Sequence, residues 1–312
     1  MNTDSKDSGN KAEAPEEKTR EQKLNSMRRE FRKTETLWLV CCCVSLIATF
    51  VYLFFIYKKQ LFADSPLKYI FIVVLLVFVF FCIYLLPVLL KKNKKYKAYS
   101  QEYKKMYIKP LLEKAFGEGT YKGTERISLE GITEFSLLRK AKSALANDCV
   151  NGVYDQVPFL RYDLTLRYDK KSSTSDCVLI ATEIKTHLKD ELQIVHEKFK
   201  IGGTDYDHPE GYGKVSSGKE SFDKKFSVYA KDIKEGERFA KRLEHAKLEK
   251  LARKDPIAVF FDKKKVYLVI KRDKDVMEAP VYRPVKEERC IKEAGEEVDI
   301  IKSWIDFLKD CV

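Results

Sequence analysis

The sequence is poor in the residues that build metal and disulfide sites. It has four histidines in 312 residues, and none is spaced from another histidine or a cysteine as zinc ligands are; they are His187, His196, His208 and His245. The eight cysteines include no C-x-x-C pair. Four of them lie in long apolar runs (Cys41, Cys42, Cys43 and Cys82), and the others are scattered (Cys149, Cys177, Cys290 and Cys311). This pattern argues against a disulfide framework and a zinc site, and it is typical of a reducing compartment.

Motifs of nucleophilic catalysis are also missing, since neither G-x-S-x-G nor a Cys/His pair in a catalytic context occurs. The stretch Gly213–Glu220, GKVSSGKE, comes near to a phosphate-binding loop, with Gly213, Gly218 and Lys219 in place. However, Glu220 stands where a hydroxyl should bind Mg²⁺, and a polar stretch precedes the motif where a buried strand is required. We therefore expect a flexible Gly-rich loop over residues 202–218, and neither a cofactor nor a metal ion.

Two stretches lack charge altogether: Leu37–Tyr57 with 21 residues and Tyr69–Leu90 with 22. A helix of about 20 apolar residues spans the hydrocarbon core of a bilayer, so residues 36–90 predict a transmembrane helical hairpin. Seven Lys/Arg precede the first run, five Lys follow the second and only three lie between them. The positive-inside rule then places both termini in the cytoplasm. The first 35 residues are polar and lack a cleavage site, so no signal peptide is expected.

The net charge of +12 does not point to nucleic acid, because residues 36–100 alone carry +7 of it. A cation surplus beside apolar runs suits lipid headgroups. The same holds for the basic exit helix expected over residues 91–116, which Pro110 is expected either to kink or to restart. We expect the lipid bilayer as a partner, and no nucleic acid. Acylation of Cys41–Cys43 is a minor alternative to their role as apolar filler.

The soluble remainder predicts an α+β domain over residues 117–312, preceded by a disordered and then basic segment over residues 1–35. Expected helices cover Ile132–Ala146, Glu235–Arg253 and Asp299–Leu308, and NDCVNG after the first of them reads as a turn. Two antiparallel hairpins are expected. One pairs residues 160–168 with 177–185, and the other pairs PIAVFFD with VYLVIKRD.

The first hairpin carries the one constellation that suggests catalysis. Asp163 on one strand and Glu183 with Lys185 on the next have the residue types with which many nucleases bind Mg²⁺ and activate water. The competing interpretation is a hairpin whose apolar face, with Leu164 and Leu166, packs on a core while its charged face is solvated. In a chain that is 34% charged, such spacing arises often by chance. We expect Asp163 and Glu183 to lie too far apart to share a metal ion.

Several stretches resemble a family of bacterial membrane proteins catalogued as a domain of unknown function (number three-one-three-seven). They are YIKPLLEKAF, NDCVNGVYDQVPF, ESFDKKFSVYAKD and VFFDKKKVYLVI, within residues 30 to 285. The most recognisable piece is Phe222-x-x-x-Phe226-x-Val228 followed by Asp232. The resemblance implies a two-span protein of the bacterial inner membrane with a cytoplasmic α+β domain, and it supplies no catalytic residues.

The sequence therefore favours a non-catalytic, membrane-anchored interaction or scaffold module with an unknown protein partner. One alternative is a membrane-tethered nuclease that uses Asp163, Glu183 and Lys185. The other is a sensor whose Gly-rich loop, residues 202–218, closes over a small ligand.

Overall fold

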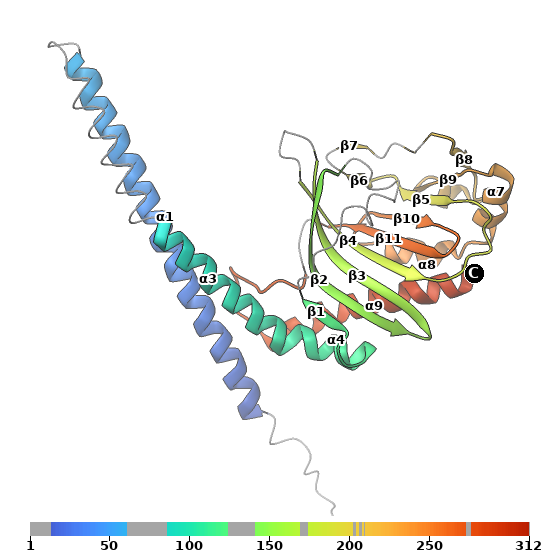
Figure 1. The fold of residues 1–312 in the computed structure, drawn as a ribbon, viewed down its shortest axis with the longest axis horizontal. Coiled ribbons are helices and arrows are strands. Elements are labelled where there is room, and N and C mark those ends of the chain that lie inside the picture. The colour runs from blue at the N-terminus through green and yellow to red at the C-terminus, as the bar shows by residue number, and fades with distance from the viewer. Residues whose placement is uncertain are drawn as a thin grey trace, which may run out of the picture. The chain divides into compact units, whose positions relative to one another are not determined.

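The computed structural model describes residues 14–60, 86–123, 141–168, 174–201, 204–205, 208, 210–272 and 276–311 (Figure 1). In the first range, side chains are described only in part beyond residue 40 and not at all beyond residue 47. The chain divides into two compact units. Unit 1 comprises residues 1–107 and 278–290, and unit 2 comprises residues 108–277 and 291–312.

Unit 1 is built on two antiparallel helices, α1 (Ala14–Gln60) and α3 (Leu86–Tyr103). Their direction follows from the ion pairs, because Glu35 meets Lys92 at 3.2 Å while Glu30 meets Lys95 at 3.4 Å. Buried Phe31 packs on Tyr96 at the same interface, with ring centroids 5.3 Å apart. The backbone is helical over the whole first predicted span, 37–57, whereas residues 69–85 of the second lie outside the described residues. Among the side chains that the structure describes, no helix has an apolar stretch long enough to cross a membrane.

A short segment, residues 278–290, is tied to this helix pair. The carboxylate of Glu278 accepts hydrogen bonds from Tyr96 (2.8 Å), Ser100 (3.0 Å) and Lys104 (2.6 Å). Burial would raise the pKa of Glu278, but Lys104, Tyr96 and Ser100 together lower it below its usual range. At the other end of the segment, the Asn25 side chain donates to the main-chain oxygen of Val285 and accepts from its amide, both at 3.0 Å. An asparagine used in this way imitates the pairing of a β-strand.

The helical path continues through a π-helical turn, Lys104–Ile108, into α4 (Lys109–Phe116), whose first turn contains Pro110. Proline lacks an amide hydrogen, and its ring clashes with the carbonyl four residues earlier. The regular hydrogen-bond ladder therefore cannot pass through Pro110, and the wider π turn takes up the mismatch. The helical path is unbroken here, and it changes from π to α geometry just before Pro110.

Unit 2 contains a nine-stranded antiparallel sheet in the order β1-β2-β3-β4-β11-β10-β5-β9-β8, which confirms the α+β class. The strands are β1 (Tyr121–Gly123), β2 (Ser143–Tyr154), β3 (Val157–Arg167), β4 (Thr174–Glu183), β5 (Leu192–His196), β8 (Gly213–Val215), β9 (Phe226–Ala230), β10 (Ile257–Phe261) and β11 (Lys265–Lys271). A separate ladder joins β6 (Lys200–Ile201) and β7 (Thr204–Asp205). The helices are α4 together with α6 (Glu220–Asp223), α7 (Ile233–Arg242), α8 (His245–Leu251) and α9 (Glu287–Cys311), of which residues 291–311 belong to unit 2.

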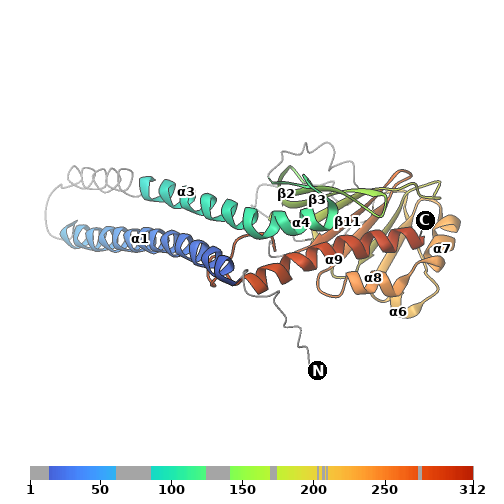
Figure 2. The ribbon, with the colours of Figure 1, turned by 90° about the horizontal axis from the view of Figure 1, so that it is seen from below.

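Both faces of the sheet are covered. One face carries an apolar cluster drawn from six strands, which includes Leu164, Leu179, Val195, Phe260 and Val269. The opposite face carries α8 and α9, as Figure 2 shows. A strand buried on both sides needs apolar residues at every position. This explains why β10, whose five residues are all buried, has the apolar sequence IAVFF. The indole nitrogen of Trp304 on α9 donates to the Thr182 hydroxyl on β4 at 2.8 Å and fixes the helix on the sheet.

Both predicted hairpins are confirmed, as β3–β4 and β10–β11. The helix predicted over Ile132–Ala146 is wrong at its end, because β2 begins at Ser143; residues 132–140 lie outside the described residues. The turn predicted at NDCVNG is also wrong. The stretch lies within β2 as a bulge, and the left-handed backbone of Asp148 (φ 51°) absorbs the extra residue.

The remaining differences concern helix lengths and the Gly-rich loop. The helix predicted over Glu235–Arg253 is broken into α7 and α8 at Leu243, whose backbone is extended and whose side chain is buried. The predicted helix Asp299–Leu308 is the end of the much longer α9. Part of the predicted loop 202–218 forms the edge strand β8, which pairs with β9. Strand β5 has no counterpart among the predicted elements.

Replacing Trp304 with Ala is expected to lower the free energy of unfolding of unit 2 by about 3–5 kcal/mol, because it empties a fully buried site and leaves Thr182 without its donor. Asp306→Ala, at an exposed position of the same helix, should change it by less than about 0.5 kcal/mol. Urea unfolding of the full chain in detergent measures both. Equal effects of the two substitutions would contradict the packing of α9 described here.

Candidate functional site

The structure keeps the three candidate nuclease residues apart. Asp163 pairs with Val178 across the β3–β4 ladder, and residues directly opposite each other point to the same face. Glu183 is five residues further along β4, so it points to the other face and lies roughly 17 Å away along the strand. It pairs instead with Lys265, whose amino group is 3.4 Å from its carboxylate. Lys185 follows the end of β4. The expected separation of Asp163 and Glu183 is therefore confirmed.

In the stretch Gly213–Glu220, which comes near to a phosphate-binding loop, polar groups of the turn are hydrogen-bonded to a nearby side chain. Gly213 belongs to β8, and Glu220 begins α6, a helix of four residues. The carboxylate of Asp223 accepts from the Ser216 hydroxyl at 2.7 Å and from the Ser217 amide at 3.1 Å. These bonds close the turn with an acidic side chain, where a phosphate would need free amides.

Three of the four histidines pack against aromatic rings, and the fourth, His187, is exposed. The His196 ring packs edge-on against Phe226, and its Nδ1 accepts from the amide of Lys198. His245 packs against Phe222, and His208 stacks on Tyr229. Within the described ranges, no group of three or more His, Cys, Asp or Glu side chains is placed to hold a metal ion.

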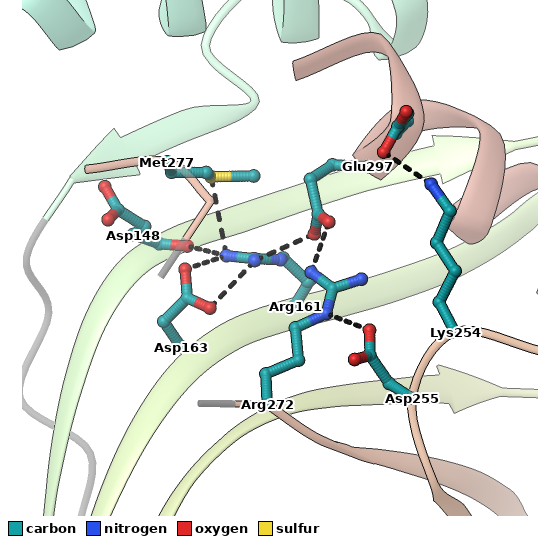
Figure 3. A network of polar contacts seen from close by, with 9 residues as sticks. Asp148, Arg161, Asp163, Lys254, Asp255, Arg272, Met277 and Glu297 are labelled. Atoms are coloured by element: carbon teal, nitrogen blue, oxygen red, sulfur yellow. Dashed lines mark hydrogen bonds and ion pairs between the residues drawn. The ribbon is translucent and has the colours of Figure 1, made fainter. Parts of the chain in front are cut away.

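What the structure does bring together is a buried chain of charges under α9, shown in Figure 3. At its centre is Arg161 on β3, whose side chain is 0% exposed. Its guanidinium makes a bidentate ion pair with Asp163, two residues along the same strand face, with 2.9 Å between Nη2 and Oδ1. The same Nη2 contacts the Glu297 carboxylate of α9 at 3.0 Å. Charge-assisted, bidentate bonds of this kind are the strongest that side chains form.

A second arginine completes the chain. The other oxygen of Glu297 is bonded to Nη1 of Arg272, which directly follows β11. Nε of Arg272 then donates to Asp255, just before β10, at 3.0 Å. Acid and base alternate along the path, so every charge in it has an opposite neighbour. The network, Asp163–Arg161–Glu297–Arg272–Asp255, ties β3 and the β10–β11 hairpin to the last helix.

The β2 bulge supplies a further partner. The main-chain oxygen of Asp148, turned by its left-handed backbone, accepts from Nη1 of Arg161 at 3.3 Å. The sulfur of Met277 lies 3.5 Å from the same nitrogen. The carboxylate of Asp148 is held in turn by the hydroxyl of Tyr121 on β1. A stretch that reads as a turn in the sequence thus shapes the pocket of a buried arginine.

The two acids that share Arg161 differ in their electrostatics. Burial would raise the pKa of Glu297, but Arg161 and Arg272 outweigh it, and the pKa lies below its usual range. Burial raises the pKa of Asp163 to about 6. Arg161 alone lowers it, which does not offset the loss of solvation, and the negative charge of Glu297 raises it further. Of these two carboxylates, Asp163 therefore takes up a proton first as the pH falls, since its pKa is raised and that of Glu297 is lowered.

The geometry of this network is that of a structural clamp. Glu297 is 2% exposed and Arg161 is sealed, so neither can meet a substrate from solution. Sequence reasoning placed Arg161 and Asp163 on a solvated face of the hairpin, and this was wrong. The alternation of charged and apolar residues along β3 is the same whether α9 or water covers the charged face. The sequence signal for this buried ion pair was the spacing of Arg161 and Asp163, which lie two residues apart on the same strand.

Comparison with known proteins relates part of the chain to a family model. Residues 177–309 fit a family model described as "Protein of unknown function (DUF3137)". The match begins in β4 and runs almost to the end of α9, so it includes Glu297 and Arg272 but excludes Arg161 and Asp163. It overlaps the expected range of 30 to 285 only in part. Neither the curated proteins nor the solved structures contain a significant match.

Glu297→Gln is expected to destabilise unit 2 by about 3–5 kcal/mol, because it leaves two buried arginines short of a counter-charge. The neighbouring residue provides the matched control, since Glu296 makes an exposed ion pair with Lys254 at 2.9 Å. Glu296→Gln should cost about 0–1 kcal/mol. Chemical unfolding of the two variants makes the comparison, and similar costs would show that the network does not hold α9.

Stability should also report the shifted pKa of Asp163. Its folded pKa of about 6 lies above the value of about 3.9 in an unfolded chain, so the folded protein binds more protons between these two values. The contribution of this group to stability is thus largest at low pH and falls as the pH rises from 4 to 6. Asp163→Asn removes the titration.

The free energy of unfolding of the wild-type chain, minus that of Asp163→Asn, should accordingly decrease by roughly 2–3 kcal/mol between pH 4 and pH 7. Urea titrations of both proteins across this range measure the difference. A difference that is constant or grows with pH would mean that Asp163 stays ionised in the folded state.

Proposed function

We propose that this chain is a non-catalytic interaction module anchored in the bacterial inner membrane. The observation that supports this proposal most strongly is the exposed apolar surface of α1. Five large apolar side chains are 51–63% exposed (Leu37, Leu39, Val40, Val44 and Ile47). All lie in the first uncharged run, and contiguous apolar exposure of this kind marks a membrane or protein contact.

The arrangement of unit 1 supports the proposed topology. The antiparallel course of α1 and α3 suits a membrane hairpin with both termini on the cytoplasmic side, as the flanking cations suggest. Where the two helices meet, Lys92 pairs with Glu35 and lies 5.1 Å from the ring centre of Trp38. A tryptophan next to a lysine at the end of an apolar run is typical of a membrane interface.

The polar residues of unit 2 support a role in interaction. Its most buried charges, those of the Arg161 network, are engaged with one another. Exposed cations such as Lys225 and Lys265 pair with acids, a mixed surface that suits a protein partner better than nucleic acid. We propose an unidentified protein as that partner. The nuclease alternative has no support in the positions of Asp163, Glu183 and Lys185.

Membrane anchoring is tested by substituting two of the exposed residues of α1. Val44→Arg with Ile47→Arg is expected to move much of the chain from the carbonate-washed membrane pellet to the supernatant. The reason is that each arginine near the centre of a span costs about 2.5–3.5 kcal/mol on insertion. Wild-type chain should stay in the pellet.

The matched control carries the same change at exposed apolar positions of unit 2. Leu145→Arg with Val153→Arg, 56% and 55% exposed, should remain in the pellet. Wild-type chain that washes off would refute the anchor. Mg²⁺-dependent cleavage of nucleic acid by the purified chain would refute the non-catalytic role, and crosslinking with mass spectrometry in native membranes would identify the partner.

A further inference from the structure

A cleft of about 720 Å³ lies in unit 2 between α7, the segment that follows β4 and the end of α9. Its floor is apolar and consists of the buried side chains of Leu188, Phe239 and Leu243. The volume falls within the range of about 300–1,000 Å³ that is usual for small-molecule sites. None of the candidate residues of the sequence interpretation other than His187 lines it.

Four cationic side chains line the cleft: Lys189, Arg238, Lys241 and Arg242. The last three lie at positions i, i+3 and i+4 of α7 and so share one face of the helix. Within the described part of the chain, none of the four makes an ion pair. Nε of Arg238 donates to the main-chain oxygen of Lys234 at 3.3 Å, which leaves its two terminal nitrogens for another acceptor.

The two acids in the lining are already engaged. The carboxylate of Glu235 accepts from the amides of Lys189 and Asp190 at 3.1–3.4 Å, so it holds the segment after β4 against α7. Asp310 is paired with Lys247 of α8. Asp310 is compensated by Lys247, which does not line the cleft, whereas Glu235 keeps its negative charge because its partners are neutral amides. The four cations of the cleft therefore outnumber its one uncompensated acid.

Helix electrostatics explains only part of this arrangement. Cations in the last turn of a helix stabilise its negative end, and this accounts for Lys241 and Arg242. It does not account for Arg238 one turn earlier, or for Lys189, which comes from a different segment. Elsewhere on unit 2, exposed cations find acids, as Lys231 does with Glu191 and Lys309 with Asp155.

We propose that this cleft binds a ligand that carries a phosphate group. Two guanidinium groups one turn apart, with two ammonium groups beside them, suit a multiply charged oxyanion better than a single carboxylate. The floor of Leu188, Phe239 and Leu243 accepts an apolar or planar part of the same ligand. The phosphate group comes from either a soluble phosphate compound or a lipid headgroup. The site does not depend on the proposed membrane anchor, because it lies entirely in unit 2.

The experiment uses the full chain in a non-ionic detergent and titrates it calorimetrically with two probes. Inorganic pyrophosphate stands for the soluble source. Dihexanoyl phosphatidic acid, below its micelle concentration, stands for the headgroup. Dihexanoyl phosphatidylcholine, whose zwitterionic headgroup has no net charge, is its counterpart without a phosphate monoester. The test variant is Arg238→Gln with Arg242→Gln. The control, Lys250→Gln with Arg253→Gln, removes two cations from a neighbouring cleft of about 640 Å³.

We expect saturable binding of one probe per chain, weakened about tenfold or more in the test variant and unchanged in the control, because each guanidinium contributes charge-assisted hydrogen bonds. Binding of pyrophosphate assigns the soluble source, and binding of phosphatidic acid alone assigns the headgroup. No binding of either probe at millimolar concentration would overturn the proposal, as would equal losses in both variants. Circular dichroism of the variants checks that both fold. Membrane fractionation is independent of these outcomes.

Discussion

One carboxylate, Glu297, holds two buried arginines that come from β3 and from the end of β11, two strands separated in the sheet by β4. Arg161 reaches it from β3 and Arg272 from the end of β11, so the pairing spans three neighbouring strands and the helix above them. A buried ion pair adds little net stability over apolar residues of similar volume, but it tolerates only one arrangement of its partners. The two pairings attach α9 to β3 and to the end of β11 on the helix-covered face. The indole–hydroxyl bond between Trp304 and Thr182 then fixes the same helix further along.

The fold class and the two main hairpins were predictable because they depend on local composition. Strands β10 and β11 are runs of apolar and β-branched residues joined by a lysine-rich turn, and this pattern has few other solutions. The bulge at Asp148 was not predictable in the same way. Asn, Asp and Gly favour turns and bulges alike, and only the pairing of β2 with β3 decides between them.

The candidate sites show a sharper limit of sequence reasoning. A strand reveals which residues share a face, but not what covers that face. Asp163 therefore looked solvated, although α9 arrives from more than a hundred residues further along the chain to bury it. The basic cleft was hidden for a related reason. Lys189 and Arg238 are separated by about fifty residues. Their segments are brought together by the pairing of β5 with β9 and by the carboxylate of Glu235, which accepts from the amide of Lys189.

The segment 278–290 gives unit 1 a composite character. It packs with α1 and α3, although the chain on both sides of it belongs to unit 2. The polypeptide therefore passes between the units three times, after residues 107, 277 and 290. A single cut at any one of these places would not release an intact half. A fragment beginning at residue 108 would carry Glu278 without Lys104 and Val285 without Asn25, so the segment 278–290 would lose these hydrogen-bond partners. Because the chain passes between the units three times, neither unit is a continuous stretch of sequence that recombination could exchange as a whole.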